Sequence, residues 1–215
     1  MPTSIVHAAM ALVLAVGLLG SHYDRRVLAV VLAVIVAPEL DALLGFVMPG
    51  AHRTVLHTMV LAAVLAGLVY WDGRRADSWL RDRWGEYGIR VAWVALFAHV
   101  FAHIALDWTH LDGINIVWPL VDQFVALDGE LYISSEGLVQ TFADISVDPT
   151  SGQQVVDAGQ SGTTQSVHVS TPVQPSKEPV GPVDRRFPIA VGGWQLYVLC
   201  TGLFVLLARR RQSDE

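Results

Sequence analysis

Three histidines and one aspartate recur along a single apolar stretch of the chain. They are His99, His103, Asp107 and His110. In a helix of 3.6 residues per turn, offsets of four, eight and eleven residues return to within about 80 degrees of one another, so all four side chains share one face. Buried polar groups are costly unless they are paired or bind a metal. The stripe therefore predicts either a metal site or a set of polar side chains hydrogen-bonded across a helix interface.

Further imidazole and carboxylate groups lie at the ends of other apolar runs. These groups are His7, Glu39, Asp41, His52 and His57. If successive runs cross a membrane in alternation, all of them meet the stripe at the same membrane face. The predicted metal ligands are therefore His7, Asp41, His52, His57, His99, His103 and Asp107.

Mixed imidazole and carboxylate ligands are typical of zinc and, less selectively, of manganese or iron. The number of groups is sufficient for one or two ions, and a two-metal site can activate water for an in-line displacement. Arg53 and Glu39 are the candidate catalytic residues. Arg53 either holds a phosphate or carboxylate oxygen or pairs with Asp41 or Asp107. Glu39 is a ligand, a general base or a helix-end residue that faces lipid headgroups.

The composition predicts a membrane protein. The 215 residues are 53% hydrophobic and 16% charged, and the mean hydropathy is +0.44. Apolar runs near residues 4–20, 27–37, 55–71, 89–107 and 189–208 favour an all-α bundle of about five transmembrane helices. The single cysteine, Cys200, excludes a disulfide framework and a cysteine metal cluster. No basic patch is present, so nucleic-acid binding is not expected.

Three regions follow from the pattern along the chain. Residues 1–125 form the expected four-helix membrane-embedded core that carries the site. Residues 126–187 form an external segment, with weak strand-like alternation at 130–147 followed by a linker rich in Ser, Thr, Gly and Pro. Residues 188–215 form a C-terminal transmembrane helix and a basic tail.

Basic residues predict the orientation in the cell membrane. Ten of the fourteen fall on one side of the alternating spans, and these are Arg25, Arg26, Arg74, Arg75, Arg81, Arg83, Arg90, Arg209, Arg210 and Arg211. Because cytoplasmic loops carry an excess of Lys and Arg, that side is cytoplasmic. We therefore expect a multi-pass protein whose C-terminus is cytoplasmic, with the site and residues 108–187 external.

The motifs also occur in a recognisable order. His7 is followed by Pro38-Glu39-Leu40-Asp41, by the run from His52-Arg53 to His57-Thr58, by His103 four residues before Asp107, and by Gly113 through Trp118-Pro119. Over about residues 1–125 this order resembles the membrane-bound metal-dependent hydrolases, the YdjM-like or LexA-binding inner-membrane-associated hydrolases. The chain departs from the family pattern at Glu39, where the family has aspartate, and at Thr54-Val55-Leu56, where the family has Gly-x-Thr.

This resemblance implies a metal-dependent hydrolase, distantly similar to zinc phospholipase C and P1-type nucleases. Membrane lipids and a small phosphoester or lipid substrate are then the expected partners, and no oligomeric state is predicted. Two alternatives remain: a b-type haem protein and a metal-transport protein. Haem ligation has no use for Asp41 and Asp107, and a transport path needs ligands on both sides of the membrane midplane.

Overall fold

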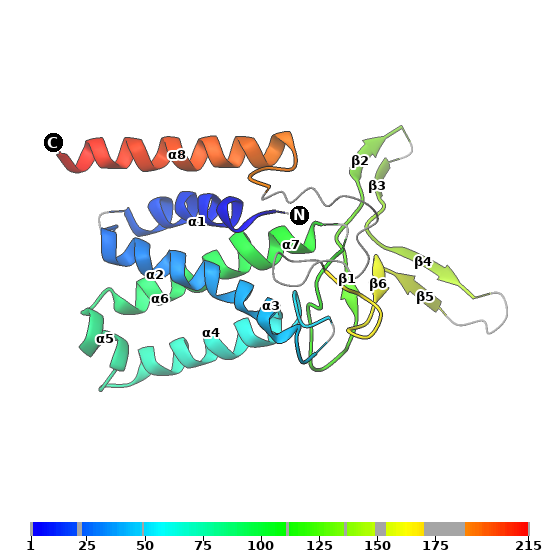
Figure 1. Cartoon of the computed structure of the whole chain (residues 1–215), viewed down its shortest axis with the longest axis horizontal. Coiled ribbons are helices and arrows are strands. Elements are labelled where there is room, and N and C mark those ends of the chain that lie inside the picture. Colours follow the sequence, from blue (N-terminus) through cyan, green and yellow to red (C-terminus); the bar gives the residue numbers. More distant parts are fainter. Residues whose placement is uncertain are drawn as a thin grey trace.

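Helices and short strands occupy opposite ends of the molecule in the computed structural model (Figure 1). The structure describes residues 2–20, 23–48, 50–110, 112–135, 137–148, 154–169 and 188–214. The helices lie roughly side by side, and the strands extend beyond one end of the bundle, at the end where α7 finishes.

The helices begin and end close to the predicted apolar runs. They are α1 (Ser4–Leu19), α2 (Arg25–Val36) with the 3-10 turn η2 (Ala37–Leu40) and α3 (Asp41–Leu44), α4 (Met59–Arg74), α5 (Trp79–Trp84), α6 (Gly88–Ala98) with the π-helical turn η3 (His99–Ile104) and α7 (Ala105–Trp108), and α8 (Gly193–Asp214). Polar side chains cap several of them: Asp24 accepts hydrogen bonds from the first turn of α2, and Thr58 and Ser78 begin α4 and α5.

The core of the bundle lies between α1, α2 and α6. Small and branched side chains such as Ala15, Val31 and Ala98 are buried there. Helix α8 packs on α1, where a side chain added at Gly202 would lie 2.9 Å from the Cβ of Ala9. Small residues allow helix backbones to approach closely, which is how helices associate in lipid.

The predicted all-α bundle of about five transmembrane helices is wrong. Within the described residues, two helical segments, Arg25–Leu44 and Gly88–Trp108, are long and apolar enough to cross a membrane. A span needs about 20 apolar residues, whereas α1 and α4 have 16 each. Helix α4 also carries Asp72 and Arg74, and α8 carries three arginines near its end. The apolar runs alone therefore predicted more membrane spans than these helices support.

Three antiparallel strand pairs also contradict the predicted all-α fold. They are β1 (Phe124–Val125) with β6 (Gln160–Gly162), β2 (Leu131–Ser134) with β3 (Gly137–Gln140), and β4 (Asp144–Val147) with β5 (Gln154–Asp157). Strands β2 to β4 occur where alternation predicted them. Strands β5 and β6 lie in the range whose composition indicated a linker, and residues 170–187 of that range lie outside the described residues.

A polar cluster joins the strands to the helical end of the molecule. Asp122 accepts hydrogen bonds from Asn115 Nδ2 at 2.7 Å and from Thr164 N and Oγ1 at 3.0 and 2.7 Å. The backbone of Thr164 in turn lies against Gly50, whose φ is +66°, and a Cβ at Gly50 would stand 2.5 Å from the Thr164 carbonyl oxygen. The close approach therefore requires glycine at position 50.

We expect acid to loosen this cluster through Asp122. Burial alone would raise the pKa of Asp122, but hydrogen bonds from Thr164 and Asn115 hold that pKa below its ordinary value. A carboxylate with a lowered folded-state pKa contributes stability above the unfolded pKa of about 3.9, and this is lost as the pH falls through the folded pKa. The protection factors of the Ile114 and Val125 amides, which are exchange rates corrected for their intrinsic pH dependence, should therefore fall in acid.

The variant Asp122→Asn should exchange faster at neutral pH and lack the acid-dependent step. Asp128→Asn, on the exposed side chain six residues further on, is the matched control and should behave as the wild type. An unchanged exchange profile in Asp122→Asn would contradict the role given to this carboxylate.

Candidate metal centre

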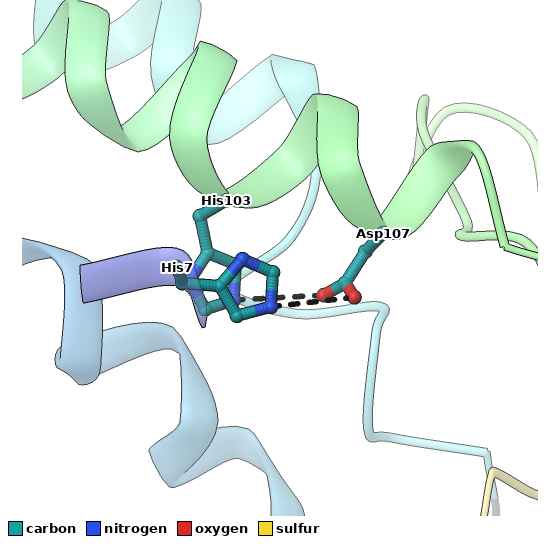
Figure 2. A group of neighbouring side chains, drawn as sticks. All are labelled: His7, His103 and Asp107. Atoms are coloured by element: carbon teal, nitrogen blue, oxygen red, sulfur yellow. Dashed lines mark ion pairs between the residues drawn. The ribbon is translucent and has the colours of Figure 1, made fainter. Parts of the chain in front are cut away.

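Three side chains from different helical segments point toward one another at the strand-bearing end of the bundle (Figure 2). They are His7 of α1, His103 of η3 and Asp107 of α7. His7 Nε2 lies 3.5 Å from Asp107 Oδ1, and His103 Nε2 lies 3.6 Å from Asp107 Oδ2. One ligand atom from each residue falls within 4.8 Å of the other two, and all three residues are buried.

His57 joins this group from the loop between α3 and α4. Its Nε2 atom lies 2.8 Å from His103 Nε2 and 3.4 Å from Asp107 Oδ2. Its ring is tilted against that of His103, which itself stacks on the His7 ring with centroids 4.2 Å apart. Three imidazoles and a carboxylate, distant in sequence, thus form one compact cluster.

Hydrogen bonds on the far side of two rings orient them. His7 Nδ1 lies 2.8 Å from the carbonyl oxygen of Ala102, and His57 Nδ1 lies 2.7 Å from Asp41 Oδ2. A carbonyl oxygen can only accept, so His7 donates through Nδ1. The Nε2 atom of the neutral His7 ring then carries the lone pair. Histidine ligands of metals are held in this way by a carbonyl or carboxylate behind the ring.

Asp41 lies behind the cluster and holds two histidines. One of its oxygens accepts from His57, and the other accepts from His52 Nδ1 at 2.8 Å. Asp41, which the sequence predicted as a metal ligand, thus contacts the cluster through His57. His52 Nε2 is buried and has no hydrogen-bond partner among the described residues.

Arg53 is fully buried and pairs with Asp107. Its Nη2 donates to Asp107 Oδ1 at 2.9 Å, and its Nη1 donates to the carbonyl of Gly113 at 3.2 Å. Of the two roles considered for Arg53, the geometry therefore favours the ion pair. Arg53 also has a φ of +63°, which is uncommon for a residue other than glycine and persists only where surrounding contacts enforce it.

The remaining predicted residues lie outside the compact cluster. His99 is buried one turn before His103, with ring centroids 6.2 Å apart, and neither of its ring nitrogens has a partner among the described residues. Glu39 accepts a hydrogen bond from the Ser4 hydroxyl at 3.2 Å. Helix α7 ends at Trp108, so His110 leaves the predicted stripe and contacts Asp112 at 3.2 Å.

The electrostatic surroundings of the centre favour positive charge. Burial alone would lower the pKa of His57, but Asp107 and Asp41 raise it to about 9. In the absence of a cation, His57 therefore carries a proton between two carboxylates. Metal binding competes with protons for such groups.

The donor set fits a divalent transition-metal ion. Zinc binds imidazole nitrogen and carboxylate oxygen at about 2.0–2.2 Å, so the edges of its coordination tetrahedron are about 3.3–3.5 Å. The 3.5 Å from His7 Nε2 to Asp107 Oδ1 and the 3.6 Å from His103 Nε2 to Asp107 Oδ2 are each close to such an edge, although they run to different oxygens of the carboxylate. His7, His103 and Asp107 would hold the ion.

Backbone carbonyl groups around the site accept hydrogen bonds that the sequence did not predict. Ala102, in the π-helical turn, supplies the carbonyl that orients His7, and π-helical turns are often found at functional sites. Thr58 donates to the carbonyls of Ile116 and Trp118 at 3.0 and 2.7 Å. In the sequence, only the motif from Gly113 to Pro119 indicated that the segment containing Ile116 and Trp118 belongs to the site.

Replacing Arg53 should destabilise the protein strongly, because it leaves the Asp107 carboxylate buried without a cationic partner. For Arg53→Ala we expect a loss of about 3–5 kcal/mol in the free energy of unfolding, measured in detergent. Arg83→Ala, at an exposed arginine of α5, is the control and should change this value by less than about 0.5 kcal/mol. Similar losses in both variants would refute the proposed pairing.

Comparisons with known proteins agree with the membrane character of the chain. A family model described as YdjM inner membrane protein matches residues 1–162. The inner membrane protein YbcI of Escherichia coli (strain K12) is 28% identical over 130 residues, which cover 57% of this chain and 70% of that protein. No solved structure gives a significant match. Because the family model spans well over half of the sequence, this chain belongs to the YdjM family of inner membrane proteins.

Proposed function

We propose that this inner membrane protein is a metal-dependent hydrolase that cleaves a phosphoester or a lipid head group. The observation that carries the proposal is the convergence of His7, His103 and Asp107 beside His57 in an otherwise apolar bundle. Desolvating four such groups is costly, and a bound cation offsets that cost. Zinc is the ion that this donor set suits best.

Three protein ligands leave one coordination position open, which is the arrangement of catalytic zinc sites. A zinc ion there supplies Lewis acidity that polarises a phosphoryl oxygen and activates water. His57 lies beside the residues that would hold the ion, with its Nε2 atom 2.8 Å from His103 Nε2 and its Nδ1 atom bonded to Asp41. The hydrogen bond to Asp41 orients His57 either as a ligand, the role that the sequence predicted, or as a group that accepts a proton at Nε2 once a bound cation has displaced the proton that His57 otherwise carries.

Arg53 and Asp41 act as positioning residues in this proposal. Arg53 holds one oxygen of Asp107 and keeps the carboxylate ionised, and Asp41 fixes the ring of His57. The buried walls of the site exclude bulk water, which strengthens electrostatic interactions with a reacting group.

Removing a proposed ligand should remove the metal. We expect purified His103→Ala and Asp107→Ala to lose zinc and all hydrolysis of phosphodiester and phospholipid substrates, measured by elemental analysis and product release. His168→Ala, on an exposed histidine, is the matched control and should keep both. His22, also expected to be dispensable, lies outside the described residues.

His57→Ala separates the two roles considered for that residue. Retained zinc with lost hydrolysis is the result expected for a proton acceptor, and lost zinc would make His57 a ligand. Full zinc content in His103→Ala, or a wild-type protein that binds zinc without cleaving either class of substrate, would refute the proposed hydrolase.

We further propose that the metal centre faces the outside of the cell and that the C-terminus is cytoplasmic. Arg90, at the start of α6, donates to the Leu18 carbonyl at the end of α1, and Arg209, near the end of α8, donates to the Gly20 carbonyl just after α1. These three helix termini therefore meet at the end of the bundle opposite the strands. Ten of the fourteen basic residues lie in segments at that end. Positive-inside orientation then makes that end cytoplasmic.

Labelling of intact cells tests this orientation. In a Cys200→Ser background, Ser161→Cys should react with an impermeant maleimide, and Asp77→Cys should react only after lysis. Both positions are exposed, so accessibility within the fold does not decide the outcome. Labelling of Asp77→Cys in intact cells, with Ser161→Cys protected, would reverse the orientation.

A further inference from the structure

A groove runs between α4 and α6. Its volume is about 860 Å³. One wall consists of the small side chains Ala62, Ala63 and Ala66, and the other consists of Trp93, Phe97 and Phe101. Because the alanines are small, the aromatic side chains across from them do not close the space between the two helices, and an apolar groove remains.

Charged side chains line this groove at one end. They are Arg81 of α5, Glu86 of the turn between α5 and α6, and Arg90 of α6. Arg90 donates to the Leu18 carbonyl at 2.6 Å, which uses one of the five donors of a guanidinium. Arg81 donates to the carbonyls of Gly73 and Arg75 at 2.8 and 3.2 Å. Its Nε atom lies 3.9 Å from Glu86, whose side chain is 94% exposed, so this ion pair is weak and screened. Two arginines against one glutamate leave a net positive charge at this end.

The length of the groove corresponds to one leaflet of a bilayer. Phe101 follows Arg90 by eleven residues along α6 and η3, a rise of about 16 Å. Half of a hydrocarbon core that is about 30 Å thick is about 15 Å. With Arg90 at the membrane surface, Phe101 therefore lies near the midplane, where an acyl chain of that leaflet ends.

We propose that this groove binds one anionic phospholipid of the leaflet next to α5. The phosphate lies at Arg81 and Arg90, and one acyl chain lies between the alanines of α4 and the aromatic side chains of α6. Basic pockets between membrane helices bind anionic head groups in this way. The site is separate from the metal centre and does not depend on hydrolysis.

Lipid retention by the full-length protein tests the site. The purified protein is reconstituted in phosphatidylcholine nanodiscs doped with phosphatidylglycerol, and retained lipids are identified by native mass spectrometry. The wild type should retain one phosphatidylglycerol in preference to phosphatidylcholine. Arg90→Gln should lower this retention about fivefold, the change expected when one basic residue near the membrane surface is lost.

Matched variants separate this site from ordinary boundary lipid. Arg83→Gln removes the same charge from α5 outside the groove, and it should leave retention unchanged. Ala63→Phe fills the groove and should abolish retention, whereas Val64→Phe adds bulk at the next residue, which does not line the groove. Equal retention of the two lipids, equal effects in either matched pair, or a second protein copy in place of lipid would overturn the proposal.

Discussion

Asp107 is a carboxylate buried at the end of an apolar helix, and an unpaired charge in such a place would cost several kcal/mol. Its two oxygens are therefore shared by partners from different segments. Arg53 and His7 lie against one oxygen, and His57 and His103 lie against the other. Helix α1, the loop before α4 and the π-helical turn must all come together for this charge to be accommodated.

The loop that carries Arg53 and His57 is held from outside the helical bundle. Arg53 accepts a backbone hydrogen bond from Asn115, and the nitrogen of Met59 donates to Ile116. Asn115 in turn bonds Asp122, which also holds Thr164. The strand-bearing segment therefore borders the candidate metal centre, because the backbone of Asn115 and Ile116 pairs with the backbone of the loop.

The two ends of the bundle differ in chemistry, and the apolar helices keep them apart. Histidines and carboxylates gather at the strand-bearing end, whereas arginines gather at the end where α5 lies. Between these ends the helix contacts are made by small side chains such as Ala62 and Ala98. Such packing depends on shape and does not require the polar groups at either end.

The apolar runs and the motif order by themselves determined the membrane character, the family and most helix positions, because helical periodicity and composition are local properties. The tertiary structure decided which polar residues meet. It placed His57 beside His103, put Asp41 behind the cluster and turned His110 away where α7 ends. Within the part of the chain that the structure describes, it also reduced the number of candidate spans to two. These outcomes depend on where a helix stops and on contacts between distant segments, and neither is encoded in the local spacing of residues.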